Sequence, residues 1–463
     1  MKTMMNRGKM TRNLLVPLGV LALGAGCATA PRHAGRPAPR PLGAQLKAAG
    51  DGAHEEIRAT PTALEGVIKL EQALALALLH NPALEAYSHE GRAAAARLLQ
   101  AGLLRNPRLM LEVEEVDRDG MGFDNVETSV ALVQWIELGS KRRRRSRVAE
   151  AEGELAGWEY EQKRLEVFSA TAQRFVGVLA AQESHALAVS MVELSEKTAH
   201  AVGERVKAGK EPPLQRSKAV AELEMAHIGL LEAENALEMA RMSLAALWGG
   251  NARFDSAHGH LDTTLGRVPD LAALRPLLAR NPDMARWESE GQLARASLAS
   301  QKAKRVPDLK ATARYVEYRE DETEALAFEV GFDLPLFDRN QGNIAAAKHN
   351  LATVAAKRRA AETALSAELA EAHAALTVAQ RKAEALRTRV VPAMQEAFDA
   401  AHEGYREGKF DFLDMLGAQR GLFEARGALV DALSSYHIAV AAVQQVTGTP
   451  IEALVEINVE ESK

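Results

Sequence analysis

The chain of 463 residues is poor in cysteine and in aromatic side chains: it has one cysteine, and Phe, Trp and Tyr together make up 5%. A single cysteine, Cys27, permits no disulfide within the chain and excludes metal sites made of several cysteines. Beyond the N-terminus no run of about 20 apolar residues occurs, so the sequence predicts no mature transmembrane helix. A membrane β-barrel stays compatible with the sequence, because short alternating strands leave a much weaker trace.

Motifs of enzymes are also missing. The sequence has neither a nucleophile elbow nor a His-Glu-x-x-His zinc motif, so we expect no enzymatic activity, no catalytic residue and no cofactor. His258-Gly-His260 is the best candidate for a metal site, but a structural site normally has three or four ligands. We therefore predict that both histidines are ordinary linker residues and that the chain has no metal site.

Residues 1–26 have the features of a secretory signal peptide, with a basic start and a short apolar core from Leu14 to Gly26. The segment ends Leu23-Gly-Ala-Gly-Cys27, which resembles the bacterial lipoprotein box, with the leucine one residue further from the cysteine than usual. The resemblance implies that Cys27 is lipidated; ordinary cleavage near Ala28 to Ala30 is the alternative. Residues 27–60 are rich in proline and predict a lipidated flexible tether.

Two stretches show an apolar residue at every second position and then pass into Ala-rich heptads. Phe328 to Leu336 alternate in this way, which predicts a strand over 326–337, and the heptads that follow predict a helix over 341–404. Two hundred positions earlier, Thr128 to Ile136 predict a strand over 126–138 before another long helix.

The whole second half repeats the first with a nearly fixed shift. Asn81-Pro82 recurs as Asn281-Pro282, and Ala208-Gly209-Lys210 recurs as Glu407-Gly408-Lys409. Such a shift indicates one structural unit duplicated in tandem. The expected segments are a first repeat at 61–250, a linker at 251–269, a second repeat at 270–448 and a polar tail at 449–463. Asn81 is expected to cap a helix that begins at Pro82.

Each unit is predicted to hold a helix, two strands, a long helix and a shorter helix, so the fold class is mainly α with a small β part. The long helices are nearly 100 Å, at about 1.5 Å per residue. The two shorter helices of a unit together almost equal its long helix, so they can stack end to end and pack antiparallel along it as a coiled coil. The other expected elements are helices at 141–206, 214–248, 282–305 and 412–447, and strands near 109–113 and 308–317.

The predicted strands have the length of a tilted membrane crossing. Four strands cannot close a membrane barrel, since the smallest barrels have about eight. Other chains must therefore complete the sheet edges. Three copies would supply a 12-stranded barrel above a hollow helical cylinder.

With this plan the chain resembles the outer membrane factor family, the TolC-like trimeric channels of bacterial efflux pumps. Leu334 to Asn343 and Glu137 to Arg142 are similar to the strand-to-helix junctions of the Czc-type heavy-metal branch. Tyr405 to Lys409 and Phe412 to Arg420 resemble the periplasmic tip turn of the family.

The resemblance implies a lipid-anchored protein of the cell outer membrane with a long periplasmic extension. It would be the passive channel of a tripartite efflux system, conducting heavy-metal cations such as cobalt, zinc and cadmium. The implied partners are two further copies in a homotrimer, a periplasmic adaptor, an inner-membrane RND-type pump and outer membrane lipid. Export of drugs or organic solutes on the same scaffold is one alternative. A periplasmic coiled-coil adaptor or scaffold is another, although it would not need four strands of this length.

The resemblance also assigns residues. The adaptor-contact tip turns would present Lys207, Gly209, Lys210, Leu214, Tyr405, Gly408, Lys409 and Leu413. Asp414 matches a position where the family often places an acidic residue at the channel constriction, and Asp411 is a possible substitute for a second acidic position that is Gly417 here.

A basic run, Lys141 to Arg147, opens the first long helix, where positive charge opposes the helix dipole. A nucleic-acid role conflicts with the signal peptide, and the formal net charge of −5 gives no general case for one, so we expect no nucleic-acid partner. The run is expected either to lie near anionic lipid headgroups or to form a solvated face. Trp135, Tyr315 and Tyr318 are candidates for an aromatic girdle, with turn packing as the alternative for both tyrosines.

Overall fold

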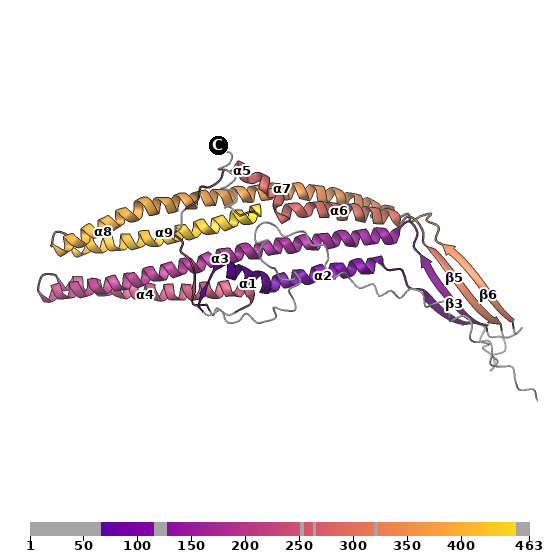
Figure 1. Ribbon diagram of the computed structural model, residues 1–463, viewed down its shortest axis with the longest axis horizontal. Coiled ribbons are helices and arrows are strands. Elements are labelled where there is room, and N and C mark those ends of the chain that lie inside the picture. The colour runs from indigo at the N-terminus through magenta and orange to yellow at the C-terminus, as the bar shows by residue number, and fades with distance from the viewer. Residues whose placement is uncertain (1–65, 115–126, 251–253, 263–264, 319–322, 451–463) are drawn as a thin grey trace, which may run out of the picture.

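The computed structural model describes residues 66–114, 127–250, 254–262, 265–318 and 323–450. The protein is a long rod of helices with a small sheet at one end (Figure 1). The opposite end of the rod carries the two helical turns that join α3 to α4 and α8 to α9. The predicted lipidation site, Cys27, lies outside the described residues. So do the tail at 451–463 and the connections at 115–126 and 319–322.

The first repeat follows the predicted order. Its elements are α1 (Leu70–His80), α2 (Pro82–Gly102), β2 (Arg108–Glu114), β3 (Glu127–Ile136), α3 (Lys141–Lys207) and α4 (Pro213–Ala245), which continues into the 3₁₀ turn η2 (Ala246–Trp248). Asn81 caps α2 as predicted, because its side-chain oxygen accepts the backbone N–H groups of Ala83 and Leu84. Both α2 and α4 lie along α3, end to end (Figure 1).

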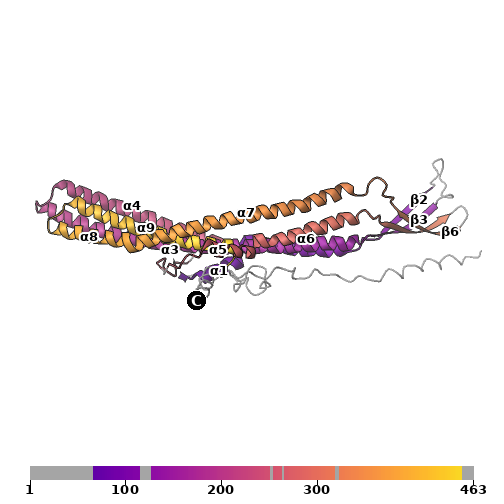
Figure 2. The ribbon, with the colours of Figure 1, turned by 90° about the horizontal axis from the view of Figure 1, so that it is seen from above.

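The second repeat has the same plan, but a 3₁₀ segment precedes α6 and a π-helical segment interrupts its longest helix. Its elements are α5 (Leu271–Leu274), η3 (Arg275–Arg280), α6 (Pro282–Ala303), β5 (Leu309–Tyr318), β6 (Thr323–Phe332), α7 (Gln341–Ala385), the π-helical segment η4 (Leu386–Val390), α8 (Val391–Arg406) and α9 (Phe412–Thr447). Seen from above, α4, α8 and α9 gather at the tip end, whereas α6 and α7 lead to the strands (Figure 2).

The four long strands form one antiparallel sheet in the order β2-β3-β5-β6. The two repeats meet at its centre, where β3 pairs with β5 from Glu127↔Tyr318 to Ile136↔Leu309. Within the described part of the chain, β2 and β6 have no partner on their outer edges. The sheet is therefore open on both sides.

Helix α3 is the axis of the rod, because α2, α4, α6 and α9 all pack against it. Its length and composition alone would let it cross a membrane, since an 18-residue window has a mean hydropathy of 1.3. Four helices pack around α3, and 22% of that apolar window is buried inside the protein. Glu161 and Arg164 form a salt bridge of 3.0 Å within this core, and both side chains are 3% exposed.

The predicted strand over 326–337 is too long. Strand β6 ends at Phe332, which pairs with Leu309, the first residue of β5. Pro307 lies two residues before Leu309, and Pro335 lies in the stretch after Phe332 that was predicted to be strand. A proline has no N–H to donate, so the hydrogen-bond ladder does not continue past Phe332.

The predicted single helix over 341–404 is also wrong in one respect. Residues 386–390 form a π-helical turn, and Pro392 lies two residues after its end. Proline lacks the N–H for the bond to residue i−4 and crowds that carbonyl, so the helix widens here instead of continuing regularly. In the same place the hydroxyl of Thr388 donates to the carbonyl of Glu384.

A short parallel pair of strands, which alternation did not predict, joins the first repeat to the linker. Strand β1 (Val67–Ile68) pairs with β4 (Ser256–Ala257), which ties the start of the first repeat to the segment after it. Two-residue strands are too short to show a period, so the sequence gives no signal for them.

Candidate functional site

One face of the sheet is mostly apolar and exposed, with Thr128, Gln134, Glu317 and Glu324 as its polar members. The register places the following side chains on this face: Leu109, Leu111 and Val113 of β2, Val130, Leu132 and Ile136 of β3, Leu309, Ala311, Ala313 and Tyr315 of β5, and Leu326, Phe328, Val330 and Phe332 of β6. Phe328 is 76% exposed and Leu111 is 73% exposed. A contiguous apolar surface of this kind marks a membrane or protein contact.

The other face of the sheet carries polar side chains together with buried apolar ones, among them Ala131, Val133 and Val316. Arg314 of β5 donates to Glu112 of β2 at 2.9 Å and to the hydroxyl of Ser129 at 3.4 Å. Alternation between a polar and an apolar face is the pattern of a strand that separates lipid from a water-filled interior. Trp135 lies on this polar face and is half-buried, whereas Tyr315 lies on the apolar face and Tyr318 on the polar face.

At the first strand-to-helix junction, carboxylates neutralise part of the basic run. Lys141 donates to Asp308 at 2.6 Å, and Arg145 donates to Glu137 at 2.8 Å. The side chains of Asp308 and Glu137 are 14% and 7% exposed. Arg145 also donates to the carbonyl oxygens of Ala101 and Leu103 near the end of α2. Part of the basic run therefore holds the junction together, which sequence reasoning missed because Asp308 is 167 residues from Lys141.

Both junctions turn through a residue in the left-handed conformation. Ser140 and Asn340, 200 positions apart, each have φ of 58°. Neither side chain caps its helix, but that of Asn340 donates to the backbone oxygen of Gln301 at 2.7 Å. The same backbone turn thus aims each long helix away from its strand.

The two tip turns share one geometry. Gly209 has φ of 70° and Gly408 has φ of 76°, the left-handed conformation that commonly ends a helix. Lys210 and Lys409 each donate a backbone N–H to a carbonyl five residues earlier, at 2.9 and 2.7 Å. Of the predicted tip residues, Lys207, Gly209, Lys210, Leu214, Gly408, Lys409 and Leu413 are exposed.

Tyr405 differs from the other predicted tip residues because it is only 4% exposed. It packs with Phe412, Val202 and Ala219 in a small core that joins the two turns. The guanidinium of Arg205 lies 4.6 Å from the centre of its ring and donates to its backbone oxygen. The side chain of Tyr405 therefore holds one repeat's tip against the other and does not face outward in this chain. Burial raises the pKa of its hydroxyl, and nearby Glu211 adds to the rise.

Asp411 and Asp414 form a capping box at the start of α9. The side chain of Asp411 accepts the N–H of Asp414 at 2.9 Å, and the side chain of Asp414 accepts the N–H of Asp411 at 3.3 Å. Both residues are exposed, and so is Gly417. Each carboxylate keeps one oxygen outside this exchange. The local structure thus gives both acids a capping role beside the one expected from the resemblance.

An ion pair links the two repeats near the tip, and two histidines lie in the linker. Arg420 of α9 donates to Glu222 of α4 at 2.9 Å, which holds the pKa of that guanidinium above its usual value and links the repeats. His258 and His260 are both exposed. In the described residues, no three His, Cys, Asp or Glu side chains are grouped in a way that would hold a metal ion.

A helical rod with a small sheet that is open at both edges and apolar on one face is the fold of TolC-like outer-membrane channels. The chain belongs to the outer membrane efflux protein family, because the profile of that family matches residues 73–250 and 273–449. The predicted family and the predicted fold class are therefore confirmed.

Named relatives are metal-resistance proteins. The chain is 32% identical to the cobalt-zinc-cadmium resistance protein CzcC of Cupriavidus metallidurans, over 84% of this chain and 92% of that protein. It is 28% identical to the nickel and cobalt resistance protein CnrC of the same organism, over 67% of this chain and 72% of that protein. The solved structure of CusC, described in terms of transmembrane channel formation, superposes with a TM-score of 0.73 at 18% identity over 91% of this chain and 99% of that one.

Proposed function

We propose that three copies of this chain form an outer-membrane channel that conducts heavy-metal cations out of the cell. The open sheet carries this proposal. Its four strands expose an apolar face that suits lipid and leave two edges that need partners, and four strands are too few to seal a pore. The β6 edge of one copy would pair with the β2 edge of the next, giving twelve antiparallel strands.

The cargo is proposed from the relatives. CzcC, CnrC and a third relative, the nickel-cobalt-cadmium resistance protein NccC, are named for resistance to divalent cations. We expect cobalt, zinc and cadmium to pass through this channel as well. A conduit needs only weak contacts with its cargo, which agrees with the exposed single carboxylates Asp411 and Asp414 at the tip.

The partners belong to the same proposal. The exposed tip turns around Gly209 and Gly408 would contact a periplasmic adaptor, and an inner-membrane RND-type pump would supply the energy. Cys27 would carry the lipid anchor. Replacing it in Cys27→Ser should remove the acyl mass from the mature protein, and an unchanged mass would contradict the anchor without touching the channel.

The test of function is deletion of the gene, followed by growth on cobalt, zinc, cadmium, nickel and copper and, in parallel, on dyes and detergents. We expect sensitivity to the divalent metals, restored by the intact gene. Sensitivity to dyes and detergents alone would contradict the metal assignment and favour export of organic solutes. Unchanged growth on every compound would contradict an efflux role.

A further inference from the structure

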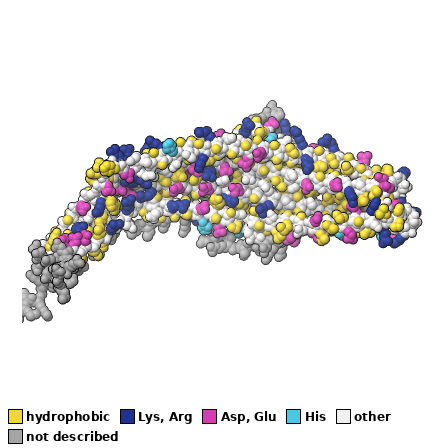
Figure 3. Space-filling view, turned by 180° about the vertical axis from the view of Figure 1, so that it is seen from behind, with side chains coloured by type: hydrophobic (Ala, Val, Ile, Leu, Met, Phe, Trp, Pro, Cys, Tyr) yellow, Lys and Arg dark blue, Asp and Glu magenta, His cyan; other side chains and the backbone are white. Residues whose placement is uncertain are grey.

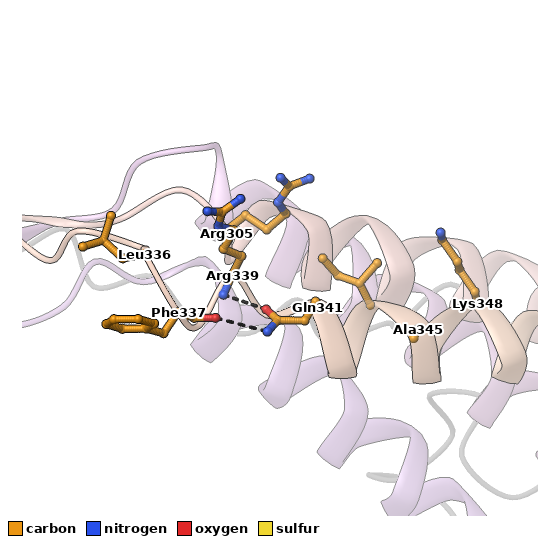
Figure 4. Close-up of a pocket in the computed structure, with 8 residues that line it drawn as sticks. Arg305, Leu336, Phe337, Arg339, Gln341, Ala345 and Lys348 are labelled. Carbon is orange, nitrogen blue, oxygen red and sulfur yellow. Dashed lines mark hydrogen bonds between the residues drawn. The ribbon is translucent and has the colours of Figure 1, made fainter.

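The second strand-to-helix junction forms a groove with three cationic side chains. Arg305 at the end of α6, Arg339 in the loop after β6 and Lys348 on α7 line a depression of about 540 Å³. All three are exposed and extend toward the same side of α7 (Figure 4). The groove lies where the sheet meets the helices, and from behind Lys and Arg side chains gather beside hydrophobic ones at this bend (Figure 3).

The same groove has an apolar part. Leu336 and Phe337 line it at the end nearer the strands, and Phe337 is 92% exposed. Leu334, two residues before Leu336, is 66% exposed. These side chains continue from the apolar face of β6, so an apolar surface runs from the sheet directly into a cationic depression.

The three cations have no acidic partner within the described part of the chain, where no carboxylate oxygen lies within 4.0 Å of them. The nearby Asp338 uses one oxygen to accept the N–H of Asn340. The first junction is different: 200 positions before Phe337 stands Glu137, whose carboxylate accepts Arg145. Within the described residues, the three cations of the second junction are therefore open to an external anion.

A phosphate attached to acyl chains fits both parts of the groove. Guanidinium groups bind phosphate oxygens through paired hydrogen bonds, and cations close to a membrane surface attract anionic headgroups. Free phosphate would use the cations alone and leave Phe337 in water. We propose that this groove binds the headgroup of an anionic phospholipid in the periplasm-facing leaflet, with its acyl chains along Leu336 and Phe337. This inference rests on the proposed membrane position of the sheet.

The experiment measures binding of fluorescent phosphatidylglycerol and, separately, phosphatidylcholine to delipidated full-length protein in detergent. The triple variant R305Q/R339Q/K348Q should weaken phosphatidylglycerol binding at least about tenfold, given a few-fold loss for each cation at a membrane surface. The matched control is K207Q/K210Q/K409Q, which removes the same charge at the tips and should bind like the wild type. Phe337→Ala should weaken binding of the lipid severalfold, because its acyl chains lose an apolar contact in the groove.

Wild-type binding by the triple variant would overturn the proposal, and so would an equal loss in the tip control. Displacement of the lipid by millimolar inorganic phosphate in the wild type would also overturn it, because the groove would then recognise phosphate without the acyl chains. The oligomer of each variant is measured in the same detergent. A loss of lipid binding in an intact oligomer supports the groove, whereas failure of the proposed channel appears separately, as an absent oligomer and unchanged metal sensitivity.

Discussion

The two strand-to-helix junctions have the same backbone but opposite ways of balancing charge. At the first junction the chain supplies its own counter-charges, because Glu137 accepts from Arg145 and Asp308 accepts from Lys141. At the second, the positions 200 residues later than Glu137, Lys141 and Arg145 are Phe337, Gln341 and Ala345. The two repeats thus share the backbone turn at this junction but differ in its charged side chains. The first junction is stabilised by ion pairs within the chain, whereas the second leaves its cations open to contact.

The position of each junction explains the difference. The first junction lies at the centre of the sheet, between β3 and β5, where the second repeat supplies Asp308. The second junction follows the edge strand β6, for which the described residues supply no neighbouring strand on the outer side. In the proposed ring, the next copy would bring Arg108 to the place that Asp308 takes at the first junction, because both follow a proline 200 positions apart.

The largest expected effect comes from breaking the first junction. In Asp308→Ala, Lys141 and the backbone N–H of Leu138 lose their acceptor while mostly buried, so the cost should be about 2–3 kcal/mol. The measurement is the midpoint of thermal unfolding in detergent at a fixed heating rate, which should fall by several degrees.

Arg108→Ala is the matched control for that change, since Arg108 is the exposed counterpart of Asp308 in the first repeat. It should cost less than about 0.5 kcal/mol of stability, so the midpoint should hardly move. Equal shifts in the two variants would contradict the internal balance assigned to the first junction.

A smaller effect should separate the two left-handed residues. Asn340→Ala loses the bond to Gln301 and keeps an unfavourable φ, which costs about 1–2 kcal/mol. Ser140→Ala changes no cap bond and should cost less than about 0.5 kcal/mol. Urea unfolding followed by circular dichroism compares the pair, and a larger loss for Ser140→Ala would contradict the assigned role of Asn340.

The long helices offer a third contrast, because α3 runs unbroken whereas its counterpart contains η4 before Pro392. Pro392→Ala restores a backbone donor, so the regular i to i−4 pattern can re-form and stabilise this region by about 1 kcal/mol or less. Hydrogen exchange should slow at residues 386–391. Unchanged exchange there would show that packing, not the proline, imposes the π turn.

The smallest effect depends on pH. Burial raises the pKa of the Asp283 carboxyl, with Glu166 adding to the rise and Arg286 opposing it, whereas the first repeat has Ala83 at the same position. A raised folded pKa means that the ionised carboxylate weakens folding above the ordinary pKa of an aspartate. Asp283→Ala should therefore raise the unfolding midpoint at pH 7, and the gain should shrink as the pH falls toward about 4. A gain that grows on acidification would contradict this sign.

The sequence predicts the elements well where a period is long. Alternation at Thr128 to Ile136 and heptads after Lys141 lead to β3 and α3 as observed, and Asn81 caps α2 as expected. It does not predict what depends on contacts between distant residues. Neither the pairing of Lys141 with Asp308 nor the burial of Tyr405 leaves a local pattern, and the end of β6 at Phe332 depends on where its partner begins.

The central claim is that the free edge of β6 pairs with the free edge of β2 in a second copy. Cysteines placed at Val113 and Phe332, which face each other when the register of β3 and β5 is carried over by 200 positions, test it directly by oxidation and denaturing electrophoresis without reductant. The account predicts covalent dimers and trimers and nothing larger, each requiring both cysteines. Chains that stay monomeric after oxidation, or a ladder that extends beyond three, would contradict it.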